Sequence, residues 1–189
     1  MLENAGASIG KIANRNMITV GGNIVDVHPW SALPVALLAL NADIVTSGTK
    51  NQKSAADEFF SKHPRQLLGY AQLVKEVHLP SDFKNADGKY VKFALTENDY
   101  PLVSIAVVLR KKMNTVDFVR VVVGALTLLP RRLSALEKEI MLTGVASENL
   151  ESVINGELEK IKIANDIRVS KDYKKKITAN LLKELLKEV

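Results

Sequence analysis

Cysteine is absent from this 189-residue sequence, and histidine occurs only three times. Without thiols the chain can form no disulfide, no thiolate zinc site and no iron–sulfur cluster of its own. The histidines, His28, His63 and His78, are scattered without the short spacing typical of metal ligands. No metal site is therefore predicted, and no nucleophile–base–acid set or carboxylate pair stands out as a catalytic group.

Aromatic residues and long apolar runs are also scarce. The chain has five phenylalanines, four tyrosines and one tryptophan, and its lysines are interleaved with acidic residues. The net charge of +5 therefore indicates a solvated surface rather than a nucleic-acid-binding face. No apolar run approaches the ~18 residues needed to cross a bilayer, and the opening Met1-Leu2-Glu3-Asn4 lacks the features of a signal peptide. We expect a cytoplasmic protein with no membrane or nucleic-acid partner.

The composition that remains, 47% hydrophobic and 25% charged residues, is ordinary for a globular protein of one domain or two small ones. Hydrophobic spacing and turn residues predict a series of short elements in the first part of the chain. We expect helices at residues 2–12 and 33–40, a helical turn at residues 54–60 capped by Ser54, and strands at residues 43–47 and 67–80.

The second part of the chain passes from β-rich runs to helical periodicity. Residues 90–94 begin this part, and we expect strands at residues 102–109 and 116–129 with a hairpin turn at Asn114-Thr115. Helices are expected between Pro130 and Gly144, at residues 150–161 and at residues 177–189. Strands followed by helices predict an α+β fold, in which helices cover one face of a sheet. The turn-rich residues 81–89 predict a boundary between domains at residues 1–85 and 86–189.

The most distinctive stretch is Thr19-Val20-Gly21-Gly22-Asn23, which stands before the apolar residues 33–40. Paired glycines let the backbone turn tightly or approach a ligand closely, and asparagine adds an amide that both donates and accepts hydrogen bonds. Exposed backbone N–H groups before a helix favour anions, so the stretch is a candidate phosphate cradle. An ordinary turn is the alternative, and the glycines taken alone favour it.

The same stretch belongs to a longer pattern made by Arg15-Asn16, residues 19–24, Pro29, Ser31 and Leu33. This pattern resembles the second flavin-binding segment of the FAD-carrying (medium) subunits of the molybdenum hydroxylases, the family of xanthine dehydrogenase and carbon monoxide dehydrogenase. Further similarities lie at Gly69 and Glu76 and at residues 101–106 and 124–131. The resemblance covers nearly the whole chain.

The resemblance implies FAD as the cofactor. It also implies a fold in which part of the second flavin-binding subdomain is followed by a C-terminal antiparallel sheet covered by helices. The residues that would face or pack against FAD are Thr19, Val20, Gly21, Gly22, Asn23 and Val74, and Lys92 would stand near the flavin ring. The charge of Lys92 would favour a reduced, anionic ring. Such a protein needs no catalytic side chains, because the cofactor performs the electron chemistry.

The implied function is electron transfer. Electrons would pass from a molybdenum-cofactor subunit and a 2Fe–2S subunit to FAD, and then to NAD or another acceptor. The alternative is a truncated or degenerate subunit with a structural, partner-binding role and no FAD of its own. The family's first flavin-binding half would precede Met1, and Ala32 replaces an aspartate that binds the adenosine portion. We therefore expect this chain alone to bind FAD weakly or not at all.

Apolar side chains beside the glycine pair are expected to be partly exposed when that first half is not present to cover them. These residues are Met17, Ile18, Val20 and Ile24, with Trp30 nearby. Because a contiguous apolar patch usually marks a contact surface, we expect self-association, most simply a two-fold homodimer.

Overall fold

A computed structural model describes residues 1–48, 51–81, 83, 86–113 and 115–189. Its helices are α1 (Leu2–Ala7), α2 (Ile12–Arg15), α3 (Val20–Val25), α4 (Ala32–Ala39), α5 (Ala56–Phe59), α6 (Pro64–Leu67), α7 (Ser134–Thr143), α8 (Leu150–Glu159) and α9 (Lys171–Lys187). Its strands are β1 (Asp43–Ser47), β2 (Gln52–Ala55), β3 (Leu73–His78), β4 (Asp87–Phe93), β5 (Val103–Lys112), β6 (Thr115–Gly124) and β7 (Arg131–Arg132). The mixture of helices and antiparallel sheets confirms the predicted α+β class.

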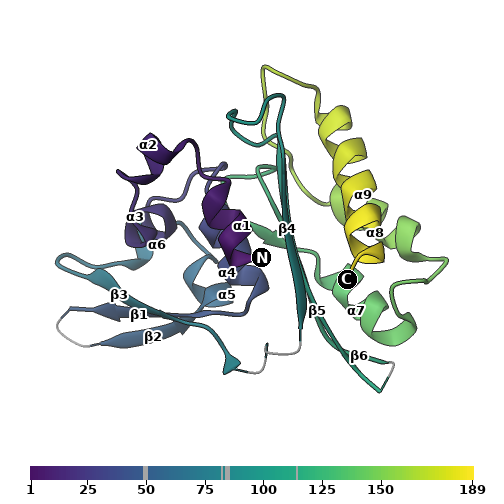
Figure 1. Cartoon of the computed structure of the whole chain (residues 1–189), viewed down its shortest axis with the longest axis horizontal. Helices are drawn as coiled ribbons and strands as arrows, with labels where there is room; N and C mark the ends of the chain where they lie inside the picture. Colours follow the sequence, from purple (N-terminus) through teal and green to yellow (C-terminus); the bar gives the residue numbers. More distant parts are fainter. Residues whose placement is uncertain (49–50, 82, 84–85, 114) are drawn as a thin grey trace.

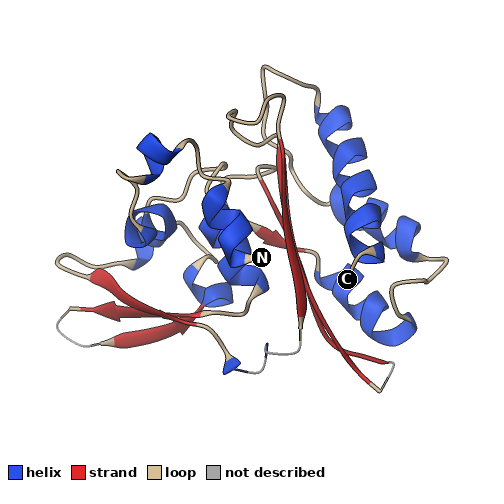
Figure 2. Ribbon diagram, in the orientation of Figure 1, coloured by secondary structure: helices blue, strands red, loops and turns tan. Residues whose placement is uncertain are grey.

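The strands form two antiparallel sheets. The larger sheet has the order β4-β5-β6-β7 and the smaller one the order β2-β1-β3. Figures 1 and 2 show the larger sheet edge-on in the middle of the molecule, with α1 and α4 on one side and α7, α8 and α9 on the other. The smaller sheet lies beside the N-terminal helices, away from the C-terminal ones.

The two faces of the larger sheet belong to two different hydrophobic cores. Successive side chains of a strand point to opposite faces. On one face, the odd-numbered residues of β5, such as Ile105 and Val107, are buried with α7, α8 and α9. On the other face, Ala106, Val108 and Val122 are buried with α1 and α4. The sequence predicted that C-terminal helices cover one face of this sheet, but it did not predict that N-terminal helices cover the other face.

Helix α4 makes the second core possible because it packs very close to the sheet. All eight of its residues are buried. A methyl group added at Gly124 would lie 2.5 Å from Val35 Cγ2 and 2.5 Å from Ser104 Oγ. A larger residue at this end of β6 must therefore displace Val35 of α4 or Ser104 of β5, so glycine suits the close packing of α4 on the sheet.

A charged network links the same two layers beside the core. Arg120 on β6 donates to Asp57 of α5 at 2.6 Å and to the Asn41 side chain at 2.7 Å. Arg132 of β7 donates to Asp57 at 2.8 Å and also pairs with the buried Glu137 of α7. Glu137 in turn accepts from the Val121 backbone N–H at 2.9 Å. These bonds connect N-terminal, sheet and C-terminal segments through Asp57 and Glu137.

Several predicted boundaries differ from the structure. The first helix ends at Ala7 rather than near residue 12, because Gly10 has a left-handed φ of +50°. Ser54 is not a helix cap: it pairs with Ile44 within β2, and α5 starts after Ala55. The strand predicted for residues 116–129 ends at Gly124.

Other predictions agree with the structure. Strand β1 and helix α4 lie where they were predicted, and Gly144, with φ of +81°, ends α7. Lys112 pairs with Thr115, as the predicted hairpin requires, although Asn114 lies outside the described residues. The predicted domain boundary at residues 81–89 also falls partly outside them, so the division into residues 1–85 and 86–189 stays a prediction.

Within the described ranges, every helix is too short or too polar to cross a lipid bilayer. The longest of them, α9, carries many lysines.

A Gly124→Ala substitution tests the close approach of α4 to the sheet. The added methyl must displace Val35 or Ser104, so we expect the free energy of unfolding to fall by about 1–3 kcal/mol in urea denaturation. Gly156→Ala is the matched control, because Gly156 lies on α8 and a methyl there would meet no atom within 4 Å. The control should stabilise the protein by about 0.5–1 kcal/mol. Equal effects of the two substitutions would contradict the tight contact.

An Asp57→Asn substitution tests the charged network through its pH dependence. Burial acts to raise the pKa of Asp57, but hydrogen bonds from Arg132 and Arg120 outweigh it and hold the pKa below its ordinary value. A lowered pKa stabilises the folded state above the unfolded pKa, about 3.9, and the gain is lost as the pH falls through the folded pKa.

We therefore expect Asp57→Asn to lower the free energy of unfolding by about 1 kcal/mol at pH 7, since the partly exposed carboxylate is screened by solvent. The difference from the wild type should shrink below pH ~4. Urea denaturation at both pH values measures it. A difference of the same size at the two pH values would contradict an ionised Asp57 in the network.

Candidate functional site

The glycine pair lies in the first turn of a helix rather than in a turn before one. Thr19 is the N-cap of α3, and its Oγ1 accepts from the Gly22 N–H at 3.0 Å. Gly21 and Gly22 have helical backbone conformations, whereas the described glycines with positive φ are Gly10 and Gly144. The prediction of a tight glycine turn was therefore wrong: the threonine cap starts a helix at once, and the glycines leave its first turn without side chains.

This first turn presents backbone donors on an open surface. Among the described residues, no acceptor is found for the N–H groups of Val20 and Gly21, and a Cβ at Gly21 would meet no atom within 4 Å. The Asn23 side chain, in contrast, already has a partner: its Oδ1 accepts from the Leu33 N–H at 3.2 Å. Asn23 thus ties α3 to the start of α4, while Val20 and Gly21 are open to a ligand.

Two neighbouring hollows lie around the predicted residues. The smaller, about 420 Å³, is lined by Thr19, Gly22 and Asn23 together with residues such as Met17 and Arg65. The larger, about 780 Å³, contains Lys92 and is bounded by residues 7–15 on one side and residues 94–98 on the other. The structure therefore places Thr19, Gly22 and Asn23 in one hollow and Lys92 in another, and Val20 and Gly21 line neither of the two.

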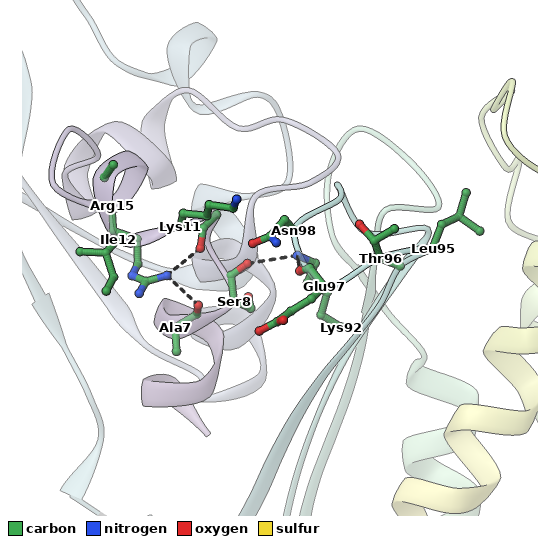
Figure 3. Close-up of a pocket in the computed structure, with 13 residues that line it drawn as sticks. Ala7, Ser8, Lys11, Ile12, Arg15, Lys92, Leu95, Thr96, Glu97 and Asn98 are labelled. Carbon is green, nitrogen blue, oxygen red and sulfur yellow. Dashed lines mark hydrogen bonds between the residues drawn. The ribbon is translucent and has the colours of Figure 1, made fainter.

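The larger hollow is cationic. Lys92 Nζ donates to the carbonyl oxygens of Glu97 at 3.1 Å and Ser8 at 3.4 Å. Burial lowers the pKa of Lys92, against the opposing effect of Asp99 and Glu97. From another side, Arg15 Nη1 donates to the carbonyls of Ala7 at 3.0 Å and Gly10 at 2.6 Å. Figure 3 shows the two cationic side chains reaching into this hollow from α2 and β4.

The sequence did not identify most of this lining. Arg15 was recognised as part of the motif but was given no role, and Ser8 and Glu97 were not singled out. These residues come from segments more than 80 positions apart, which only the pairing of α1 with β4 brings together. The one signal in the sequence that pointed to this hollow was the cluster of Lys11, Arg15 and Asn16 after the first helix.

Val74 lies in neither of these two hollows. It is half-buried on β3 and packs against the core that holds Ile24 and α4. Its strand contacts α3, which carries the glycine segment. Its predicted contact with a cofactor stays a prediction.

An aromatic stack borders the site. The His28 and Trp30 rings are 4.8 Å apart at an interplanar angle of 18°, and Trp30 and Tyr100 are 4.5 Å apart at 30°. Trp30 is 42% exposed, and Met17, Ile18 and Val20 are also exposed, as predicted. Ile24 is fully buried, contrary to the prediction, because it lies on the inner side of α3 in the second core.

The residues present fit a dinucleotide cofactor in part. Open N–H groups on a turn without side chains suit a pyrophosphate, and the cation of Lys92 suits a flavin that becomes anionic. The position of the missing carboxylate, Ala32, is 3% exposed at the first residue of α4. No acceptor for an adenosine hydroxyl therefore comes from this residue.

Two family models match the chain. Residues 1–82 match the FAD binding domain in molybdopterin dehydrogenase, and residues 89–189 match the CO dehydrogenase flavoprotein C-terminal domain. The chain therefore belongs to the FAD-binding flavoproteins of the molybdenum hydroxylase family. Its second half, residues 89–189, is the part that matches the carbon monoxide dehydrogenase flavoprotein domain.

Similar proteins agree with this assignment. The glyceraldehyde dehydrogenase medium chain of Sulfolobus acidocaldarius is 28% identical over 192 residues, which cover 100% of this chain and 67% of that protein. The carbon monoxide dehydrogenase medium chain of Hydrogenophaga pseudoflava is 25% identical, covering 91% of this chain and 60% of that one. This chain thus spans about two thirds of the length of these relatives.

Solved structures share the fold. Carbon monoxide dehydrogenase from Hydrogenophaga pseudoflava superimposes with a TM-score of 0.87 at 24% identity, covering 96% of this chain and 63% of that chain. Quinoline 2-oxidoreductase from Pseudomonas putida 86 gives a TM-score of 0.83 at 17% identity. The arrangement of the two sheets and their helices is therefore shared with the matching chains of these two structures.

Proposed function

We propose that this chain is the FAD-binding electron-transfer component of a molybdenum hydroxylase. Bound FAD would carry electrons from iron–sulfur clusters on partner chains to NAD or another acceptor. The partners proposed are a molybdenum-cofactor subunit and a 2Fe–2S subunit. The observation that carries the proposal is the open first turn of α3, where Val20 and Gly21 offer backbone N–H groups beside the Thr19 cap.

The chain's own residues would bind the cofactor at two places, the first turn of α3 beside the smaller hollow and the larger hollow around Lys92. Backbone N–H groups of Val20 and Gly21 would bind the pyrophosphate, while Asn23 holds α3 against α4. Lys92 would stand near the flavin ring in the larger hollow, where it is already held by the Glu97 and Ser8 carbonyls. The segment from Arg15 to Met17 lies between the hollows, since Arg15 lines one and Met17 the other.

The alternative function is a structural, partner-binding subunit that holds no FAD of its own. Ala32 favours it, because the family's aspartate acceptor is lost there and one lost hydrogen bond weakens binding by about 1–3 kcal/mol. The exposed residues Met17, Ile18, Val20 and Trp30 would then serve contacts with partner chains or with a second copy in a homodimer.

Gly21→Val distinguishes the two functions. Its side chain projects into open space, so the fold should persist, but it would block the approach of a pyrophosphate to the α3 N–H groups. We expect weak FAD binding by the wild-type chain in a fluorescence titration and at least a tenfold loss in the variant. Gly156→Val, on the open surface of α8, is the matched control and should bind like the wild type.

Gly22 is a less suitable site for this test, because a Cβ there would lie 3.0 Å from Thr19 Oγ1 and disturb the cap itself. Equal FAD affinity of Gly21→Val and the wild type would exclude the proposed pyrophosphate site. Complete absence of FAD binding, with partner subunits present, would favour the structural function.

Lys92→Gln tests the placement of the flavin ring. Removing a cation beside the ring disfavours its reduced, anionic form, so we expect the midpoint potential of bound FAD to become more negative by tens of millivolts. Lys89→Gln removes the same charge from the same strand, but Lys89 lies on the opposite face of the sheet and pairs with Glu188, the residue after α9. Spectroelectrochemical titration of the FAD-loaded protein compares them. Equal shifts in the two variants would place the ring elsewhere.

A further inference from the structure

Arg168, in the segment between α8 and α9, bonds to a distant loop. Its Nη1 donates to the Tyr100 carbonyl at 2.7 Å and its Nη2 to the Pro101 carbonyl at 3.4 Å. These carbonyls belong to the connection between β4 and β5, and earlier residues of that connection, 94–98, line the larger hollow. Arg168 thus contacts the same loop that forms one wall of the proposed flavin site.

The guanidinium is itself held in a fixed plane. Its Nε and Nη2 donate to the two oxygens of Asp166 at 2.9 and 2.8 Å, a bidentate pair. Asp166 also pairs with Lys174 Nζ at 2.9 Å, and Lys174 donates to the Ala125 carbonyl at 3.2 Å. The Lys174 side chain is only 4% exposed. The chain of bonds therefore runs from the buried end of β6 to the exposed loop.

These bonds keep Asp166 ionised. The hydrogen bond from Arg168 holds the pKa of Asp166 far below its ordinary value, against the opposing effect of burial, and Lys174 adds to the lowering. The bidentate pair with the ionised Asp166 fixes the direction in which Arg168 points.

The loop that Arg168 holds makes two contacts at the site. The Glu97 carbonyl accepts the hydrogen bond from Lys92. The Tyr100 ring stacks on Trp30, which belongs to the N-terminal part of the chain. A displacement of residues 100–101 would therefore move both the partner of Lys92 and the support of Trp30.

We propose that Arg168, through its bonds to Tyr100 and Pro101, is a positioning residue for the flavin hollow. It fixes the β4–β5 loop so that Glu97 holds Lys92 and Tyr100 stacks on Trp30. The flavin part of this inference rests on the proposed function, whereas the loop contacts are independent of it. A merely structural alternative is that Arg168 fastens only the start of α9, without influence on the hollow.

Trp30 provides a direct readout, because it is the one tryptophan in the sequence. In Arg168→Gln the Tyr100 carbonyl loses its charged donor, so we expect the Trp30 emission to shift to longer wavelength and its quenching by acrylamide to increase. Tyr100→Ala removes the stacked ring directly and should produce the same change. Lys175→Gln on α9 breaks a surface pair with Glu159 at the end of α8 and should leave the emission unchanged.

Circular dichroism shows whether each variant is folded. If Arg168→Gln does not fold, Arg168→Lys replaces it in the same measurements. Lysine keeps the charge beside Asp166 but cannot form the bidentate pair and reach both carbonyls, so an intermediate emission shift is expected. A folded Arg168 variant with the emission and quenching of the wild type would overturn the positioning role.

The FAD affinity of the same set of proteins is measured by titration with FAD. We expect Arg168→Gln to lower the FAD affinity severalfold relative to Lys175→Gln. A shifted Trp30 emission with unchanged FAD affinity would overturn the link to the flavin hollow. Complete absence of FAD binding by the wild type, with partner subunits present, would overturn the proposed function, while the Trp30 comparison would still decide whether Arg168 positions the loop.

Discussion

The structure depends on one sheet whose two faces are both buried. Strand β5 is apolar on both faces, so layers must cover it from both sides. The C-terminal helices supply one layer and α1 and α4 the other. In the second layer, α4 packs close to the sheet because Gly124 has no side chain, which leaves room for Val35 of α4. The N-terminal and C-terminal helices therefore pack on opposite faces of the same sheet.

This shared sheet also determines where the site forms. Lys92 projects from β4 on the face that α1 covers, so the larger hollow opens at the seam between the N-terminal layer and the sheet. Asn23 couples α3 to α4, which lies against the same face. Arg168 approaches the loop at the end of β4 from the other layer. Residues from all three layers thus meet around a site whose motif occupies only a few positions.

The sequence predicted the elements whose signals are local. Helix α4 follows from a continuous Leu/Ala/Val run, β1 from its β-branched residues, and the end of α7 from Gly144. It failed where pairing decides the outcome: Ser54 resembles a helix cap, but it is drawn into β2 by pairing with Ile44. The motif located the α3 residues and Lys92 by resemblance. The hollow around Lys92 could not be predicted, because its lining depends on contacts between segments distant in sequence.

The central claim is that the open first turn of α3 and the hollow around Lys92 together receive FAD. Backbone amide NMR of the isotope-labelled chain during addition of FAD tests this claim most directly, since it reports on each N–H group separately. The account predicts the largest shift changes at Val20 and Gly21 and along residues 92–98. Changes confined to α7, α8 and α9, or changes equal throughout the chain, would contradict it.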